Sequence, residues 1–297
     1  MLSRELSLDT IPSTPTPEMF ALEDLGNTEL LVYAHKEEIT EALLNNQFVM
    51  LISPTGTGKS TQGLQYALEA GFAPIYNSQP RRRAAMNVAA RIVDELTEKV
   101  GEELARESVA CHTGDGLEGR YDALAQVLTE GTLRVRNTYD PTTGSTRELW
   151  ILDEVHEGSA EMWMLMGIAK EKAAADPNFT VMVMTATANK FDTVDYLTNE
   201  MGVEPAVIEL TGGTNYEIEH REEPMSTTAR EAVKAAIDIF ENPDEHGGSN
   251  TIQVFEAGVG EIKDTIDSIL RQLPPEVRAR TTVLPNHGKL PREEQRP

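Results

Sequence analysis

The sequence has little cysteine, little positive charge and no long hydrophobic run, and each shortage excludes a class of protein. Cys111 is the only cysteine in 297 residues, which excludes an internal disulfide and favours a reducing compartment. We expect Cys111 to be a small buried apolar residue, as free cysteines usually are. No segment approaches the roughly 18 consecutive apolar residues of a membrane-spanning helix. The first residues carry acid where a signal peptide needs an apolar core. We therefore expect a cytoplasmic, non-secreted protein with no membrane partner.

Positive charge is scarce, because 26 lysines and arginines face 49 acidic residues, a formal net charge of −23. The electrostatic potential of so negative a protein disfavours non-specific attraction to nucleic acid or anionic lipid. Any binding of nucleic acid must therefore use local basic patches. Residues 79–93 hold four arginines and no acid, and residues 131–147 hold three arginines and one acid, Asp140.

Short apolar segments alternate with helical periodicity over most of the chain. The spacing predicts helices over 28–47, 59–69 and 83–100, and strands at Phe48–Ile52, Ala73–Tyr76, Val109–Cys111, Leu149–Leu152 and Val181–Met184, with Leu124–Leu128 readable as either. This alternation is typical of an α/β domain with a parallel sheet.

Composition shifts divide the chain into three parts. We expect a flexible arm over 1–27, where prolines lie among serine and threonine, a first domain over 28–212, and a partial second domain over 213–297 beyond a Gly-Gly hinge. After the hinge, the pattern predicts helices at Thr227–Phe240 and Gly260–Leu273 and strands at Thr251–Phe255 and Thr281–Leu284. A complete domain of this type needs about 100 residues or more, so the second one is expected to be incomplete.

The strongest motif is Ser53-Pro-Thr-Gly-Thr-Gly-Lys-Ser-Thr61, which follows an apolar strand and begins a helix. Glycines let successive backbone N–H groups curl around phosphate oxygens at the positive end of a helix. Lys59 would reach the β- and γ-phosphates, and the Ser60 hydroxyl would bind Mg²⁺. Ser53 replaces the first glycine of the general pattern. The nucleotide-binding residues predicted are Thr55, Gly56, Thr57, Gly58, Lys59, Ser60 and Thr61.

A second motif, Asp153-Glu154-Val-His156, follows the apolar segment Leu149–Leu152. Asp153 would hold Mg²⁺ through water, and Glu154 would orient and deprotonate the attacking water. A helix N-cap explains an isolated acid pair nearly as well, but the upstream phosphate loop favours a magnesium site made of Ser60, Asp153 and Glu154. The catalytic residues predicted are Glu154, Lys59 and His156, with His156 sensing the γ-phosphate.

A third motif, Met184-Thr185-Ala-Thr187, again ends an apolar strand. Alone it is a polar strand terminus, but beside the other two motifs it predicts a coupling role for Thr185 and Thr187, which would relay between the nucleotide and a second ligand.

Taken in order, these motifs resemble those of the DExH helicases, most closely the DEAH-box RNA helicases. Gln79-Pro-Arg-Arg82 and Thr129-Glu-Gly131 resemble the family's first two strand-contacting motifs, and Asp153–His156 resembles its signature box. Val254-Phe255 and His287-Gly288 resemble the start of its second RecA-like domain. Gly158 departs from the family's usual arginine. The family's later arginines, which reach the γ-phosphate, lie beyond this chain, so we expect a truncated or naturally short relative.

The resemblance implies an α/β fold, with a RecA-like P-loop NTPase domain followed by an incomplete second RecA-like domain. It implies an ATP-dependent RNA helicase that uses ATP and Mg²⁺ and binds single-stranded RNA, with a protein activator as a further partner. Arg81, Arg82 and Thr129 would contact RNA phosphates. The alternatives are a P-loop ATPase that translocates on DNA, and an ATP-binding regulatory module with little turnover. For the arginines, the alternative is a solvated helix start.

Overall fold

The computed structural model describes residues 14–21, 23–139, 146–186, 194–211, 227–243, 251–287 and residue 290. The chain divides into two compact units, Met1–Ile218 and Glu219–Pro297. The expected boundary at 212/213 lies outside the described residues. Each unit is described below by itself.

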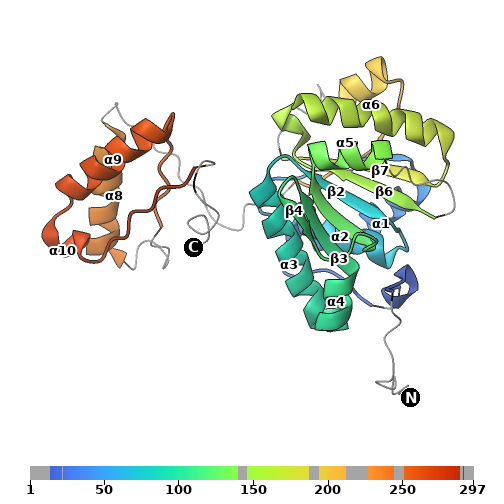
Figure 1. The fold of residues 1–297 in the computed structure, drawn as a ribbon, viewed down its shortest axis with the longest axis horizontal. Helices are drawn as coiled ribbons and strands as arrows, with labels where there is room; N and C mark the ends of the chain where they lie inside the picture. Colours follow the sequence, from blue (N-terminus) through green and yellow to red (C-terminus); the bar gives the residue numbers. More distant parts are fainter. Residues whose placement is uncertain are drawn as a thin grey trace. The chain divides into compact units, whose positions relative to one another are not determined.

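The first unit is built on a sheet of eight strands in the order β4-β3-β5-β2-β6-β7-β1-β8 (Figure 1). All neighbouring strands are parallel except β3 and β4, which form an antiparallel edge. The strands are β1 Phe48–Ile52, β2 Ile75–Gln79, β3 Val109–Thr113, β4 Gly116–Glu118, β5 Ala125–Thr129, β6 Glu148–Leu152, β7 Phe179–Thr185 and β8 Ala206–Glu209. The α/β fold with a mostly parallel sheet is confirmed.

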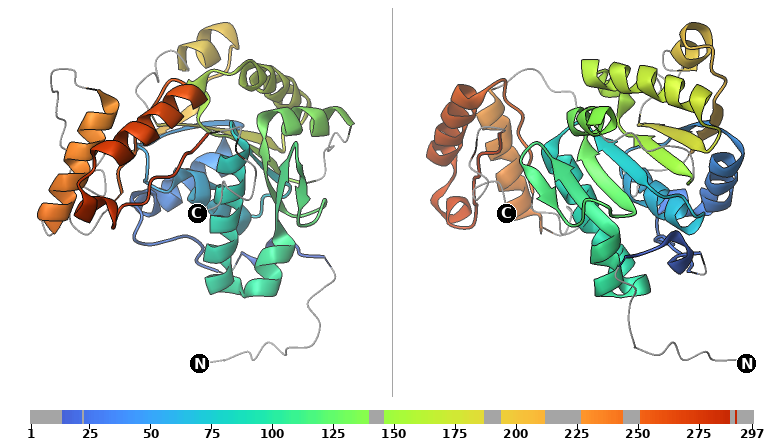
Figure 2. Two further views of the ribbon diagram at one scale, coloured as in Figure 1. Left: turned by 60° about the vertical axis from the view of Figure 1, so that its left-hand side comes forward. Right: turned by 45° about the vertical axis from the view of Figure 1, so that its right-hand side comes forward.

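Helices cover both faces of this sheet (Figure 2). One core packs α1 Lys36–Asn45, α2 Lys59–Glu69, α3 Arg82–Val100 and α4 Glu102–Ser108 against one face. A second core packs α5 Glu130–Tyr139, α6 Ala160–Ala175 and the π-helical turn Tyr196–Glu200 against the other. Because both faces are covered, strands such as β1 are apolar at every position and fully buried.

Strand β6 shows how the two cores divide the side chains. Leu149 and Ile151 point into the first core, and Trp150 points into the second. The Trp150 indole donates to buried Glu148 at 2.7 Å, and Lys172 of α6 lies 3.0 Å from the same carboxylate. Cys111 is buried as expected, and burial raises the pKa of its thiol to about 11.

Several predicted elements shift at their ends. The helix over 59–69 forms as predicted, whereas the one over 28–47 is a 3-10 turn, Leu31–His35, followed by α1. The strand predicted at Ala73–Tyr76 begins later, at Ile75, because Pro74 has no N–H for the ladder. The ambiguous segment Leu124–Leu128 is a strand, β5.

The expectation of a loose arm over 1–27 is wrong for its second half. Phe20 and Leu25 are completely buried and belong to the first core. The Leu25 amide donates to Glu69 of α2 at 2.9 Å, and the Asn27 amide donates to Gln62 of the same helix at 2.7 Å. These contacts hold the segment against the helix that follows the phosphate loop.

The second unit contains α8 Thr228–Glu241, α9 Val259–Gln272 and the short α10 Pro275–Arg278 around a small core of Val233, Ile269 and Leu273. The strands predicted at Thr251–Phe255 and Thr281–Leu284 are wrong, because neither segment pairs with another strand in the part of the chain that the structure describes. Both segments instead line a cavity of about 470 Å³. At its rim Phe255 is 80% exposed and Leu284 is 71% exposed.

Within the described ranges, no helix has the length and apolar character that crossing a bilayer requires.

We expect Ile151→Ala to lower the free energy of unfolding of the first unit by about 2–5 kcal/mol, because it opens a cavity in the centre of the sheet. Ile151 is completely buried. The control Val207→Ala, at a side chain that is 46% exposed, should cost about 0.5 kcal/mol or less. Urea unfolding followed by tryptophan fluorescence measures this unit, since both tryptophans, Trp150 and Trp163, lie in it. Equal losses in the two variants would contradict this account of the core.

Candidate nucleotide-binding site

The phosphate loop lies between the carboxyl end of β1 and the first turn of α2. Gly56 and Gly58 have φ angles of +81° and +94°, which a side chain would strain. A Cβ on Gly58 would also lie 2.5 Å from Leu30 Cδ1. Gly58 immediately precedes α2, so the unpaired N–H groups and the positive end of that helix face the loop.

Ser53, which replaces the first glycine of the pattern, has a structural part in the loop. It is completely buried, and its hydroxyl is hydrogen-bonded to the Thr57 hydroxyl across the loop. Its amide donates to the Thr185 carbonyl of β7 at 3.1 Å. The substitution therefore closes the loop with a side-chain hydrogen bond, and the backbone amide, which any residue would supply, ties the loop to the predicted coupling motif.

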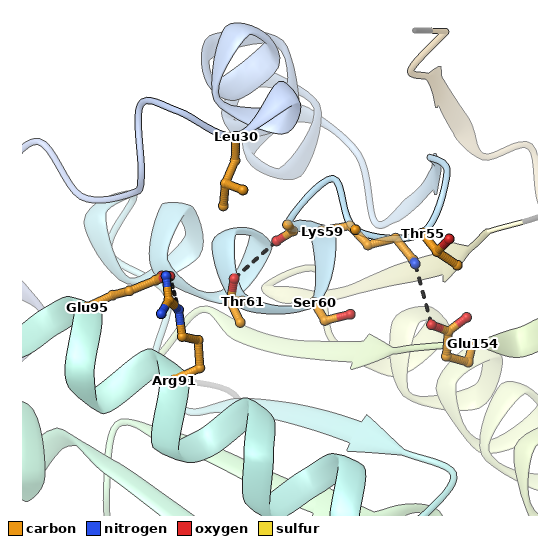
Figure 3. Close-up of a pocket in the computed structure, with 10 residues that line it drawn as sticks. Leu30, Thr55, Lys59, Ser60, Thr61, Arg91, Glu95 and Glu154 are labelled. Carbon is orange, nitrogen blue, oxygen red and sulfur yellow. Dashed lines mark hydrogen bonds and ion pairs between the residues drawn. The ribbon is translucent and has the colours of Figure 1, made fainter. Parts of the chain in front are cut away.

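The Lys59 ammonium is nearly buried and lies 3.4 Å from Glu154 Oε1 (Figure 3). Glu154 has φ of +54°, the only positive φ of a non-glycine residue in the described ranges. On its other side, Glu154 Oε2 lies 3.4 Å from His156 Nδ1, and the Thr185 hydroxyl lies 3.4 Å from the same nitrogen. Lys59, Glu154, His156 and Thr185 thus form one continuous polar chain. Thr187 lies outside the described residues.

Asp153 is completely buried and is held by two hydrogen bonds. Its Oδ1 accepts from the Glu154 amide, and its Oδ2 accepts from Gln79 Nε2, both at 2.9 Å. Gln79 also donates to Asn77 Oδ1, and Asn77 donates to the Ser60 carbonyl. This network joins β2, β6 and α2. The Gln79 side chain, assigned from the sequence to a strand-contacting motif, points instead to Asp153.

A cavity of about 290 Å³ opens beside this chain of residues. It is lined by Leu30, Thr55, Gly56, Gly58, Lys59, Ser60, Thr61, Arg91, Glu95 and Glu154. Thr57 is buried within the loop. Three of these residues, Leu30, Arg91 and Glu95, belong to no motif in the sequence, because they come from the segment before α1 and from α3.

Arg91 and Glu95 form a fixed pair in the cavity wall (Figure 3). Arg91 Nε lies 2.6 Å from Glu95 Oε1, and the other Glu95 oxygen accepts from Gln62 and Gln65 of α2 at 2.7 and 2.6 Å. The i, i+4 spacing of an arginine and a glutamate on a predicted helix was the signal available in the sequence.

The predicted RNA-contacting residues lie at the same sheet edge as Asp153 but do not line the cavity. Arg81 is 74% exposed and lies 3.1 Å from Glu157. Arg82 lies 2.7 Å from Asp115. The Thr129 hydroxyl, at the end of β5, is hydrogen-bonded to the Thr132 hydroxyl at 2.8 Å. Each residue therefore already has a protein partner that a phosphate would replace or join.

The donors around Asp153 fit a magnesium ion rather than an all-protein metal cage. Within the described residues, no three histidine, cysteine or acidic side chains gather into a metal cluster. Mg²⁺ in nucleotide sites is usually bound by one or two carboxylates together with substrate phosphates. A carboxylate has about four lone-pair sites, so Asp153 keeps capacity for a metal-bound water beyond its two hydrogen bonds.

Comparison with protein-family profiles gives no match. Among curated proteins, the chain is 26% identical over 280 residues to the ATP-dependent RNA helicase HrpA of Borreliella burgdorferi, covering 91% of this chain and 32% of the relative. It is 29% identical to HrpA of Escherichia coli, covering 90% and 20%. It is 30% identical to the probable ATP-dependent RNA helicase spindle-E of Drosophila pseudoobscura pseudoobscura, covering 81% and 19%. The chain therefore spans a third or less of these relatives.

Solved structures of DExH and DEAH proteins are also similar to this chain. The E. coli DExH-box NTPase HrpB matches with a TM-score of 0.62 at 26% identity, covering 91% of this chain and 32% of that one. A second structure, titled the E. coli DEAH/RHA helicase HrpB, matches with a TM-score of 0.65 at 25% identity, covering 90% and 32%. In sequence and in fold, about 90% of this chain is thus related to the DEAH/DExH helicases.

Proposed function

We propose that this chain carries the ATP-hydrolysing site of a DEAH/DExH-type RNA helicase, and that it hydrolyses Mg-ATP in response to single-stranded RNA. The observation that carries the proposal is the meeting of Lys59, Ser60 and Glu154 in one cavity at the N-terminus of α2, with Asp153 directly behind them. The two segments that supply these side chains, one with Lys59 and Ser60 and one with Asp153 and Glu154, are far apart in the sequence.

Lys59 and the first turn of α2 would bind the phosphates. The helix N-terminus offers backbone N–H donors and partial positive charge, and the Lys59 side chain adds a cation to the same end of the cavity. Its contact with Glu154 at 3.4 Å is long for an ion pair. Bound phosphates would therefore draw the ammonium away from Glu154 at small cost.

Glu154 would accept the proton of the attacking water once Lys59 has turned to the phosphates. His156, 3.4 Å from the same carboxylate, would orient it, and Thr185 fixes the position of the histidine ring. The Ser60 hydroxyl and the Asp153 carboxylate would hold Mg²⁺, which supplies charge neutralisation across the phosphate oxygens when it is bound.

Two observations support RNA as the activating ligand. Exposed arginines lie at the same sheet edge, and the relatives are named as RNA helicases. Arg81 and Arg82 are exposed enough for their guanidinium groups to meet a phosphate backbone. Contacts to phosphate carry no sequence information. Comparing the ATPase rate with single-stranded RNA, single-stranded DNA and neither separates an RNA helicase from a DNA translocase and from a regulator with little turnover.

We expect Glu154→Gln to bind Mg-ATP while hydrolysis falls by about 10²-fold or more, because the amide keeps the shape of the side chain but cannot accept a proton. Lys59→Ala, in contrast, should lose detectable binding, because it removes the cation aimed at the phosphates. A fluorescent ATP analogue measures binding, and released phosphate measures turnover. Unchanged turnover in Glu154→Gln, or unchanged affinity in Lys59→Ala, would contradict the assigned roles.

We expect the salt dependence of RNA binding to be shallow, with log K falling against log salt with a slope of about −2 to −3, since few basic side chains are available. Changing Arg81 and Arg82 together to alanine should flatten the slope by roughly 0.7–1.4, the value of one to two phosphate contacts on a single strand.

The control is Arg106→Ala, which removes another exposed and paired guanidinium. It lies on α4 before the amino end of β3, at the opposite edge of the sheet, and should leave the slope unchanged. Fluorescence anisotropy of a labelled single-stranded RNA over a salt series gives the slopes. Parallel slopes for the parent and the double variant would place the RNA path elsewhere.

A further inference from the structure

Three side-chain contacts join the predicted RNA-contacting segments to the turn that follows Glu154 and to the start of α6. Arg81, after β2, lies 3.1 Å from Glu157. Arg134, on α5, lies 2.6 Å from Glu161 at the start of α6. Glu130, which follows Thr129, accepts a short hydrogen bond from the Ser159 hydroxyl. Neither the motif analysis nor the proposed hydrolysis uses Glu157, Ser159 or Glu161.

The turn that carries Glu157 is short and tightly hydrogen-bonded. It runs from Glu154 to Gly158, and both of these residues have left-handed backbone angles, with φ of +54° and +61°. The Glu157 amide donates to the Glu154 carbonyl at 2.9 Å, and the Gly158 amide donates to the Val155 carbonyl at 3.1 Å. A displacement of the Glu157 backbone would therefore be transmitted to the backbone of Glu154.

Ser159 anchors the far end of this turn. Its hydroxyl oxygen accepts from the Met162 amide at 2.9 Å, which caps α6. The same hydroxyl donates to Glu130, so the cap is shared with the segment that carries Thr129. Because α6 packs into the second core, the turn is fixed to the helix at one end and to β6 at the other.

Three carboxylates but only two arginines take part in these contacts. The carboxylates are those of Glu130, Glu157 and Glu161. Burial raises the pKa of Glu130, and the nearby negative charges of Glu157 and Glu161 raise it further. Arg81 pairs with Glu157, and Arg134 pairs with Glu161. An RNA phosphate that approaches Arg81 meets the Glu157 carboxylate on the same guanidinium, and like charges at this distance repel.

We propose, on the basis of the proposed function, that Glu157 occupies the place of an RNA phosphate on Arg81, and that RNA displaces it and so shifts the turn that carries Glu154. Glu157 is then a positioning residue that links RNA binding to the nucleotide cavity. In the absence of RNA, the turn holds Glu154 beside Lys59. Displacement of Glu157 moves the turn and frees Lys59 for the phosphates, so RNA and Mg-ATP bind with positive cooperativity.

The experiment measures the affinity for a fluorescent ATP analogue with Mg²⁺, with and without a saturating uridine oligonucleotide. In the parent, RNA should tighten nucleotide binding. Glu157→Gln keeps the shape of the side chain and removes the charge, so it should tighten binding about two- to fivefold without RNA, the range expected for an exposed ion pair. RNA should then add little more. By linkage, the affinity for RNA should rise by a similar factor.

Arg81→Gln breaks the same ion pair from the other side. Without RNA, it should shift the affinity for nucleotide by the same factor as Glu157→Gln, and the double variant should shift it no further, because only one contact is lost. The control is Glu102→Gln, which removes a carboxylate from another exposed pair, with Arg106 on α4, 2.9 Å apart. It should leave both affinities as in the parent.

The outcomes separate this inference from the proposed function. If the parent does not bind RNA, the proposed function fails, while equal shifts in Glu157→Gln and Arg81→Gln would still support the link between Arg81 and the cavity. If Glu157→Gln behaves as Glu102→Gln does, the link is overturned even when RNA stimulates the parent. Unequal shifts in the two single variants, or additive shifts in the double variant, would overturn it as well.

Discussion

Parallel strand pairing places the carboxyl ends of seven strands at one edge of the sheet, and the whole site depends on this register. Ile52 of β1 lies opposite Thr185 of β7, and Gln79 of β2 lies opposite Thr129 of β5. The residues that follow each strand therefore converge although long stretches of sequence separate them. A register shift of one residue would turn every side chain of a strand to the other face, which would bring polar groups into one of the two cores. The cores thus fix the register, and the register fixes the site.

The same strands meet two opposing demands, because their middles must be apolar and their ends must be polar. Asn77 and Gln79 of β2 are completely or almost completely buried, and each has hydrogen-bond partners in neighbouring elements. A buried amide without a partner would cost about 1–3 kcal/mol, and a buried carboxylate would cost more. The network from Ser60 to Asp153 therefore stabilises the edge and also orients a carboxylate that the proposed chemistry uses.

Local patterns in the sequence predicted most of this first unit. Phe48–Ile52 and the helix over 59–69 are found at their predicted bounds, because an apolar run and a Gly-Lys-Ser turn are properties of adjacent residues. The segments Thr251–Phe255 and Thr281–Leu284 have equally good strand composition but form no ladder in the described residues. Strand formation needs a partner, and composition alone does not provide one.

Long-range contacts account for what the sequence did not predict at the site. Leu30, from the segment before α1, and Arg91, from α3, reach the cavity only because their elements pack against α2. The roles of Lys59, Glu154 and Arg81 stay predictions from motif and geometry. The ion pairs that Arg81 and Arg82 form with Glu157 and Asp115 could not be read from the sequence, since the partners lie on separate loops.

The hydrogen bond between Ser53 and Thr57 has a consequence for the energetics of nucleotide exchange. A glycine at position 53 would leave the loop to find its shape when phosphate arrives, and ordering a backbone residue costs about 1–2 kcal/mol. Here the two hydroxyls and the Thr185 carbonyl hold the loop in shape without a ligand. The entropy of ordering has then been lost during folding rather than during binding, so an incoming phosphate meets a rigid receptor. The hydrogen bond between the two hydroxyls needs no ligand, so departure of the product need not disorder the loop.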